Sequence, residues 1–441
     1  MTDWTTNSTD ALHLSLVRSS QDKEALGDNE SYENFHPTFT YPIYGEDEKI
    51  YGYTDLVIDL RFASGSLAHF LQIKYSSKLA SLSTLDDVQG TLQKFIPEDY
   101  YQSEAEFLAR VEEDATSFRP SGEKIYSYTR AVPYSARKGK GVAMTLPEDD
   151  PDAITYEVWH VRAVASLLLN PLMLSQATWK TPGFREYHRR MQLFILLYIE
   201  AGSYIDEVED SWEFVVLYEK RKRRTSPDTE TYHFVGYSTL YPFYCFPDKT
   251  RLRLSQFVIV PPYQHQGHGS ALYNAIYQYV LAQPCVTELT VEDPAEAFED
   301  LRDRNDLAML LGHVTFMAEA FGAHAVSHDG GRVGRVRTLA KGKSAGKLGP
   351  PSDRAWLERW RKELKIAGRQ FHRLVEMLIQ LNLNPADARA ARAYRLQVKE
   401  RLYRFNYEAL VQLEEKERLE KLEETFQSVR EDYQRILAMV R

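Results

Sequence analysis

The chain has 441 residues, of which 43% are hydrophobic and 12% aromatic, so it can fill more than one packed core. Its formal net charge is −9, and no apolar run approaches the roughly 18 residues of a membrane span. Two cysteines, Cys245 and Cys285, are too few for a disulfide framework or a zinc cluster, and the 12 histidines show no metal-ligand spacing. We therefore expect a metal-free protein of the cytosol or nucleus, with no membrane partner.

Charge is unevenly distributed along the chain. Residues 191–300 hold 16 acidic and 8 basic residues, a local net charge of −8, whereas residues 331–350 hold six basic residues and no acidic one. An acidic surface attracts a cationic substrate and repels nucleic acid. A solvated acidic face has the same composition, so charge alone leaves both interpretations open.

Four segments are predicted from the changes in composition. Residues 1–186 form a mixed α+β domain, and residues 187–326 form a second domain that contains the most informative motif. A basic, glycine-rich linker follows at 327–352, and residues 353–441 form a helical carboxy-terminal domain. The length of the chain agrees with two or three folded domains and one linker.

In the amino-terminal domain, the segment 52–62 has Leu56, Ile58, Leu60 and Phe62 on one face, which is typical of a half-buried strand. Helical stretches are expected near 86–95 and 103–112. The second domain should open with a helix over 187–204. Its second half is apolar almost all round and should therefore be buried.

Three strands are predicted to follow that helix, and the charged run 219–228 is expected to be the hairpin loop between the first two. The strands are Trp212–Tyr218, Tyr232–Phe243 and Leu252–Val260.

The run Phe257–Val260 ends at two prolines and is followed by Gln264-x-x-Gly267-x-Gly269 and then by apolar residues at helical spacing over 270–282. Backbone N–H groups of such a loop, together with the helix N-terminus, favour a phosphate or pyrophosphate. The spacing lacks the lysine of a nucleoside-triphosphate loop and differs from the dinucleotide pattern Gly-x-Gly-x-x-Gly. A glycine-rich turn without a ligand remains the alternative.

Gln/Arg-x-x-Gly-x-Gly/Ala after a strand resembles the acetyl-CoA pyrophosphate loop of the GCN5-related N-acetyltransferase superfamily. The fold class implied is α/β (α+β), namely that acetyltransferase fold with a mixed amino-terminal domain and a helical carboxy-terminal domain.

Acetyl transfer to an amine needs a base, because a lysine amine holds its proton at neutral pH. Glu292 and Asp293 end a strand predicted at 286–291, which should form a right-handed parallel crossover with the strand before the glycine loop. The alternative for this pair is a strand-ending Glu-Asp-Pro turn. Glu200 follows the apolar run 194–199 on the expected helix over 187–204. It either faces solvent at a helix end or is a buried carboxylate with a function.

Beyond the linker, two or three helices are expected. Apolar residues over 419–440 follow a 3-4 spacing for about three heptads, which is compatible with a short coiled coil or a helical pair.

A more specific resemblance covers roughly residues 10–325 and rests on several motifs together. The chain resembles the family of type B histone acetyltransferase catalytic subunits. The motifs are Phe257-Val-Ile, Pro261-Pro-Tyr-Gln-His-Gln-Gly-His-Gly, Glu292-Asp-Pro, Ile199-Glu-Ala-Gly-Ser-Tyr-Ile-Asp, Tyr244-x-x-Pro-Asp-Lys-Thr-Arg and Tyr44-Gly-Glu-Asp-Glu.

The resemblance implies roles for individual residues. Glu292 is the general base, with Glu200 and Asp293 as supporting carboxylates. His265 stands where some members of the family have glycine. The implied coenzyme contacts are Phe257, Val258, Ile259, Gln264, His265, Gln266, Gly267, His268, Gly269, Ser270, Phe298 and Arg304. The implied contacts to the substrate are Glu46, Asp47, Glu48, Trp212, Tyr241, Pro242 and Phe243.

The same resemblance implies acetyl-CoA as co-substrate, the histone H4 tail of a soluble histone H3–H4 dimer as acceptor, and a WD-repeat histone-chaperone subunit as partner. It implies a place in both cytoplasm and nucleus, and no direct contact with nucleic acid. Two alternatives stay open. One is an acetyltransferase for another protein or a small amine, and the other is a non-catalytic histone-binding module with the same fold.

Overall fold

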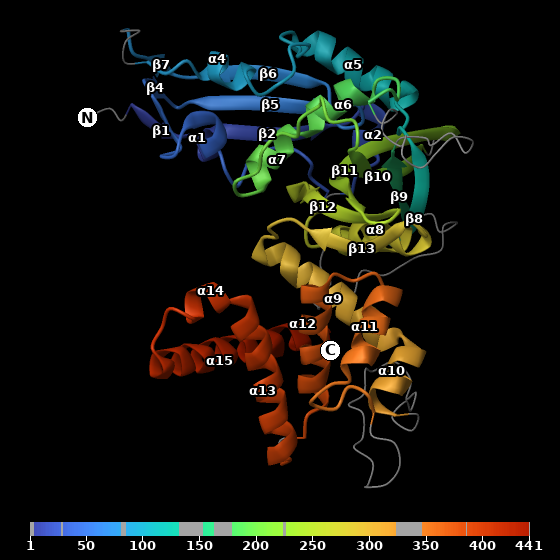
Figure 1. Cartoon of the computed structure of the whole chain (residues 1–441). Helices are drawn as coiled ribbons and strands as arrows, with labels where there is room; N and C mark the ends of the chain where they lie inside the picture. The colour runs from blue at the N-terminus through green and yellow to red at the C-terminus, as the bar shows by residue number, and fades with distance from the viewer. Residues whose placement is uncertain are drawn as a thin grey trace. The chain divides into compact units, whose positions relative to one another are not determined.

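A computed structural model describes residues 4–27, 30–80, 85–131, 153–162, 179–223, 226–322, 346–384 and 386–440. The chain divides into two compact units, which are described separately. The first comprises Met1–Phe243, Arg253–Tyr279 and Val291–Asp293, and the second comprises Tyr244–Leu252, Val280–Thr290 and Pro294–Arg441. Figure 1 shows both units and labels most of their elements.

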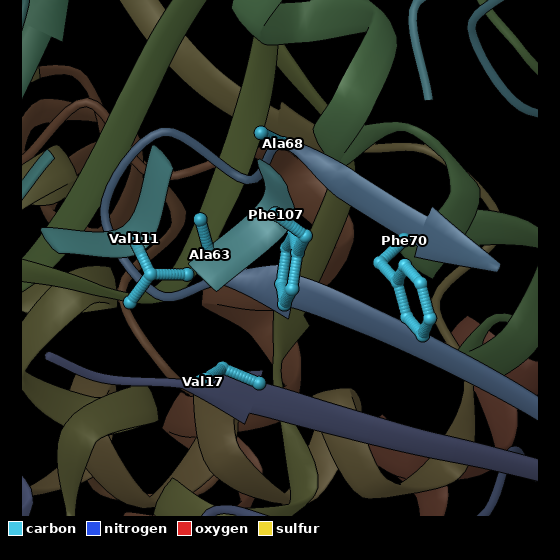
Figure 2. Close-up of a cluster of buried hydrophobic side chains, with 6 residues drawn as sticks. All are labelled: Val17, Ala63, Ala68, Phe70, Phe107 and Val111. Atoms are coloured by element: carbon cyan, nitrogen blue, oxygen red, sulfur yellow. The ribbon is translucent and has the colours of Figure 1, made fainter. Parts of the chain in front are cut away.

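A three-stranded sheet and helix α5 (Glu104–Ser117) form the amino-terminal core of the first unit. The strand order is β2-β5-β6, with β2 parallel to β5 and β5 antiparallel to β6. Phe107 of α5 stacks on Phe70 of β6, with ring centroids 5.5 Å apart. Figure 2 shows the buried cluster that these two side chains share with four smaller ones. The strands are β2 (Leu12–Val17), β5 (Val57–Ala63) and β6 (His69–Lys74).

Short elements surround this core, and polar side chains cap several of the helices. Ser103 accepts a hydrogen bond from the first turn of α5, and Asp87 does the same for α4. The helices expected near 86–95 and 103–112 are therefore confirmed as α4 and α5. The short elements are β1 (Thr5–Asn7), α1 (Ser8–Ala11), α2 (Ser20–Glu24), α3 (Tyr41–Tyr44), β3 (Lys49–Tyr51), β4 (Tyr53–Thr54), β7 (Ser77–Lys78) and α4 (Val88–Gln93).

A six-stranded sheet with the order β13-β12-β11-β10-β9-β8 carries the predicted site. Strands β9 and β10 pair antiparallel, so the sheet joins residues from both sides of the boundary predicted at residue 186. The strands are β8 (Glu123–Ala131), β9 (Ala153–Val161), β10 (Glu213–Arg223), β11 (Ser226–Cys245), β12 (Lys249–Ile259) and β13 (Val286–Val291).

The hairpin expected between the first two strands is confirmed, but its loop, predicted at 219–228, is too long, because Glu219–Arg223 continue β10 and β11 begins at Ser226. Arg18 explains the difference. Its Nη1 and Nη2 donate to the two carboxylate oxygens of Glu219 at 3.0 and 2.9 Å, and both side chains are almost fully buried. A charged residue can continue a buried strand where a second charge satisfies it.

Burial alone would raise the pKa of the Glu219 carboxyl, but the guanidinium groups of Arg18 and Arg221 hold it well below its ordinary value. The hydroxyl of Tyr263 also donates to this carboxylate, at 2.7 Å. We call these four residues the buried ion cluster. It ties β2 and β10 to the segment that immediately precedes the glycine loop.

The apolar helix expected over 187–204 is two short helices, α6 (Phe184–Met191) and α7 (Leu193–Tyr198). Its predicted burial is confirmed for Leu193–Leu197. The helix ends at Tyr198, so Glu200 lies beyond it in a turn.

The two strands of the predicted strand–helix–strand unit, β12 and β13, run parallel, as expected. The N–H of Thr250 donates to the carbonyl of Cys285, and further along both strands the N–H of Glu292 donates to the carbonyl of Leu254. Residues 261–263 form a 3-10 turn after β12, and α8 (His268–Ala282) begins two residues before its predicted start. The predicted strand at 286–291 is confirmed as β13.

The second unit is mainly helical, and its described part has five helices after residue 353, where two or three were expected. Asp353 and Asp387 are the N-caps of two of these helices. An aspartate before a helical stretch signals a helix start, and the sequence prediction did not use this signal. The helices are α9 (Glu296–Gly312), α10 (Val314–Phe321), α11 (Arg354–Glu363), α12 (Gly368–Asn382), α13 (Ala388–Phe405), α14 (Tyr407–Leu410) and α15 (Glu415–Val440).

The predicted heptads lie on α15, which packs against α9, α12 and α13 of the same chain. Leu422, Phe426, Tyr433 and Ile436 are buried in this packing, whereas Leu419 is exposed. The apolar heptad positions thus pack inside a helical bundle of the same chain. Most of the predicted basic linker, residues 327–345, lies outside the described residues. None of the helices in the described ranges combines the length and apolar character needed to cross a membrane.

Candidate active site

The glycine loop is shaped by its own glutamine side chains. Nε2 of Gln264 donates to the carbonyl of Ile259 at 2.7 Å, and Nε2 of Gln266 donates to the carbonyl of Pro262 at 2.9 Å. His265 has a φ of +60°, which is the left-handed region that favours glycine.

Gly267 has a φ of +83°, and a Cβ built on it would lie 3.4 Å from Nη2 of Arg130. The backbone therefore needs glycine for its conformation, and the missing side chain leaves room next to a guanidinium group. Helix α8 begins at the next residue. A helix N-terminus, a glycine and a cation at one place fit a phosphate-bearing ligand.

If this loop holds the pyrophosphate of acetyl-CoA, as the resemblance implies, Gly267→Asp should raise the Kd for acetyl-CoA by at least about tenfold, because a new carboxylate would repel the pyrophosphate and pair with Arg130. Calorimetry measures this directly. Gly183→Asp is the matched control, because Gly183 also has a positive φ, +72°, and a Cβ there would meet no described atom within 4 Å. Equal affinity of both variants and the wild type would remove the loop from the coenzyme site.

His268, the first residue of α8, is buried, and its Nδ1 lies 2.7 Å from the hydroxyl of Tyr128. Burial lowers the pKa of His268 to about 4; the charge of Glu219 opposes this shift and that of Arg130 reinforces it. The ring is therefore neutral at pH 7 and fastens β8 to the start of α8. This agrees with a role in the shape of the loop.

The strand before the loop combines a half-buried Phe257 with buried Val258 and Ile259. The register of β10 and β11 shifts directly after the pair Leu217–Gly236, so the sheet is irregular here. A Cβ on Gly236 would lie 2.3 Å from the carbonyl oxygen of Val258, so only glycine permits this close approach of β11 to β12.

Glu292 follows β13 directly, as predicted, and its carboxylate is held by two residues of β12. The hydroxyl of Ser255 donates to Oε2 at 2.8 Å, and Nη1 of Arg253 donates to Oε1 at 3.3 Å. The side chain remains 47% exposed, so it is accessible from solvent. Sequence reasoning missed Ser255 and Arg253. Their spacing of two on a strand beside Glu292 was the available signal.

The two carboxylates that are predicted to support Glu292 are exposed. Asp293 follows Glu292 with a φ of +30°. Glu200 faces solvent in the turn after α7, so of its two expected environments the structure has the solvent-facing one. The N–H of Ala201 donates to the hydroxyl of Tyr41 at 2.6 Å, which connects this turn to the segment of the acidic residues.

Three aromatic residues lie in an unbroken row that leads to Glu292. Trp212 contacts Tyr241 with ring centroids 4.9 Å apart, and Tyr241 contacts Phe243 at 4.8 Å. Cζ of Arg253 lies 4.4 Å from the Phe243 ring centroid, and Arg253 in turn contacts Glu292. This aromatic row, Trp212, Tyr241 and Phe243, joins the predicted substrate contacts to the predicted base. Pro242 lies between Tyr241 and Phe243 on β11 and is half-buried, and because side chains alternate along a strand it belongs to the opposite face of the sheet.

The three consecutive acidic residues Glu46, Asp47 and Glu48, which we call the acidic turn, are of two kinds. Glu46 and Asp47 are exposed, whereas Oε1 of Glu48 accepts hydrogen bonds from the N–H groups of Thr40, at 2.6 Å, and Tyr41, at 3.1 Å. The Glu48 carboxylate thus holds the turn together. The other two carboxylates are the ones presented to solvent.

Phe298 and Arg304 belong to the second unit, on α9. Phe298 is half-buried, and Nε of Arg304 donates to the carbonyl of Asp300 one turn earlier. Within the described ranges, no group of three or more histidine, cysteine or acidic side chains is arranged to hold a metal ion.

Three family models match the chain. Residues 4–200 match "Histone acetyl transferase HAT1 N-terminus", residues 191–299 match "Acetyltransferase (GNAT) family", and residues 337–384 match "Fungal HAT1, C-terminal".

Two relatives are similar over almost the whole chain. The histone acetyltransferase type B catalytic subunit of Cryptococcus neoformans var. neoformans serotype D (strain JEC21) is 49% identical, over 99% of this chain and 98% of that protein. The protein of the same description from Mycosarcoma maydis is 42% identical, over 98% and 87%. A solved aminoglycoside acetyltransferase from a soil metagenome is 15% identical over 34% of this chain and 83% of that one, with a TM-score of 0.21.

Proposed function

Because the chain belongs to the family of histone acetyltransferase type B catalytic subunits, we propose that it transfers acetyl groups from acetyl-CoA to lysine side chains of the free histone H4 tail. The observation that carries this proposal is the line of contacts from the aromatic row through Arg253 to Glu292. Aromatic faces and exposed carboxylates suit a basic peptide, and the line ends at a carboxylate that can accept a proton.

Glu292 would act as the general base, directly or through a water. A lysine amine has an ordinary pKa near 10.4, so removing its proton at pH 7 costs about 5 kcal/mol. The neutral amine would attack the thioester carbonyl, the carbon–sulfur bond would break, and the thiolate would take up a proton. A backbone N–H near Val258 would stabilise the oxyanion, and Glu200 and Asp293 would support the proton transfer.

Acetyl-CoA would lie with its pyrophosphate on residues 264–270 and its pantetheine arm along Phe257–Ile259, with Phe298 and Arg304 as further contacts. Support comes from Gly267, whose positive φ and missing side chain fit a phosphate, and from the neighbouring guanidinium group. We further propose a soluble histone H3–H4 dimer as substrate, a WD-repeat histone-chaperone partner, no direct nucleic-acid contact, and a place in cytoplasm and nucleus.

The exposed acidic residues give a testable consequence. We expect Glu46→Gln combined with Asp47→Asn to raise KM for an H4-tail peptide about threefold, because two exposed ion pairs with the tail are lost. The Kd for acetyl-CoA should not change. Added salt should raise the wild-type KM more than that of the double variant.

Glu415→Gln combined with Glu417→Gln removes the same charge from exposed positions on α15 and should leave KM unchanged. If the Glu46/Asp47 variant shows the salt dependence of the wild type, the tail does not bind at the acidic turn.

The proposal is tested against a small-amine substrate by comparing acetylation of an H4-tail peptide with that of spermidine at equal concentration. A much higher kcat/KM for the peptide supports it. Preference for the polyamine, or binding of the peptide without acetyl transfer, would overturn it.

A further inference from the structure

Strand β8 brings two side chains to the glycine loop, although it lies outside residues 191–299, which match the acetyltransferase model. Tyr128 and Arg130 are two residues apart and therefore lie on the same face of the sheet. Tyr128 contacts His268 at the start of α8, and Arg130 lies beside Gly267. Both contacts are within the first unit.

The guanidinium group of Arg130 is fixed against an aromatic ring. Its Cζ lies 4.9 Å from the centroid of the Tyr128 ring, and the side chain is half-buried. Stacking on a ring limits the directions in which the N–H groups can point, so less entropy is lost when they bind a ligand. Partial burial also strengthens an interaction with an anion relative to bulk water.

We propose that Arg130 binds a phosphate group of the coenzyme, so that a strand of the amino-terminal region completes the coenzyme site. This inference rests on the proposed acetyl-CoA-dependent function. A planar guanidinium group can donate two hydrogen bonds to one phosphate group. Because Gly267 has no side chain, a phosphate at the loop can approach Arg130 through the space that a Cβ would fill.

The first test measures acetyl-CoA binding by calorimetry. We expect Arg130→Gln to raise the Kd by about tenfold, which is the usual effect of losing a hydrogen bond to a charged group. The Kd of this variant should also depend less on salt concentration than that of the wild type. Arg130→Lys should keep the salt dependence and give an intermediate Kd, since it keeps the charge but not the planar fork.

Arg162→Gln is the matched control. Cζ of Arg162 also lies over a tyrosine of α8, 5.7 Å from the Tyr279 ring centroid, but near the other end of that helix. Loss of this arginine should leave the Kd and its salt dependence unchanged.

The second test identifies the phosphate group. If Arg130 binds the pyrophosphate, Arg130→Gln should weaken CoA and 3′-dephospho-CoA by the same factor. If it binds the 3′-phosphate, only CoA should be affected. Both results support the inference.

A folded Arg130→Gln protein with the wild-type Kd and salt dependence would overturn the inference and leave the proposed function standing. A wild-type protein that does not bind acetyl-CoA would instead overturn the proposed function.

Discussion

Glu292→Gln should lower kcat for histone acetylation by about 10²–10⁴-fold, which is the usual contribution of a general base. The amide keeps the size of the side chain and can still accept a hydrogen bond from Ser255, but it cannot take the proton of the attacking amine. Because Glu292 lies outside the glycine loop, the Kd for acetyl-CoA should stay at the wild-type value. Steady-state kinetics and calorimetry on the same preparation measure both quantities.

Glu296→Gln is the matched control for this variant. Glu296 lies four residues later, its side chain is 87% exposed, and it should be replaceable without loss of kcat. Combining Glu292→Gln with Glu200→Gln should give a non-additive loss if both carboxylates belong to one proton path. A Glu292→Gln enzyme with the wild-type kcat would show that the proton leaves by another route.

The buried ion cluster should have the largest effect on stability. Glu219→Gln leaves Arg18 buried without its carboxylate partner, and removing one member of a buried ion pair typically costs about 3–5 kcal/mol of unfolding free energy. Urea denaturation at neutral pH measures this loss. Because the cluster includes Tyr263 next to the glycine loop, weaker acetyl-CoA binding should accompany the loss of stability.

The pH dependence of this loss has a definite sign. The pKa of Glu219 is lowered in the folded protein, so the stability that its charge contributes is fully present above the ordinary value of 4.5. That contribution decreases as the pH falls below 4.5 toward the folded-state pKa. The difference between wild type and Glu219→Gln should therefore shrink in acid.

An exposed ion pair provides the control. Lys23 and Glu33 are paired with side chains that are 46% and 50% exposed, and such pairs contribute at most about 1 kcal/mol. Glu33→Gln should therefore leave the unfolding free energy nearly unchanged. A loss of similar size in both variants would show that the burial of Glu219 has no special importance.

The parallel unit around the glycine loop could be predicted from sequence because its signals are local. Prolines end β12, glycines form the loop, apolar spacing marks α8, and Glu292 follows β13 in the chain. Each of these features is visible within about ten residues, and the structure confirms their order and direction.

The residues that sequence reasoning missed depend on contacts distant in sequence. Glu219 looks like part of a charged loop until Arg18, which is 201 positions earlier, is placed beside it. Arg130 lies beside Gly267 only because β8 joins the six-stranded sheet, and no local sequence pattern predicts that β8 pairs there. Ser255 was recognisable as a strand residue, but its bond to Glu292 depends on the register of β12 and β13.

Glu48 shows the same limit of sequence-based prediction within a single motif. Three consecutive acidic residues look alike in sequence, and the resemblance gave all three one role. The structure separates them, because the carboxylate of Glu48 accepts two backbone hydrogen bonds inside the turn. Only the fold decides which of the three acids accepts these bonds.

The central claim is acetyl transfer to free histone H4, and mass spectrometry tests it most directly. The purified wild-type chain would be incubated with acetyl-CoA and soluble histone H3–H4, and acetylated lysines would be mapped, with Glu292→Gln as a parallel sample. We predict acetylation concentrated on lysines of the H4 tail in the wild-type sample and greatly reduced in the variant. Absence of acetylated H4 with the wild-type protein, or equal acetylation in both samples, would contradict this account.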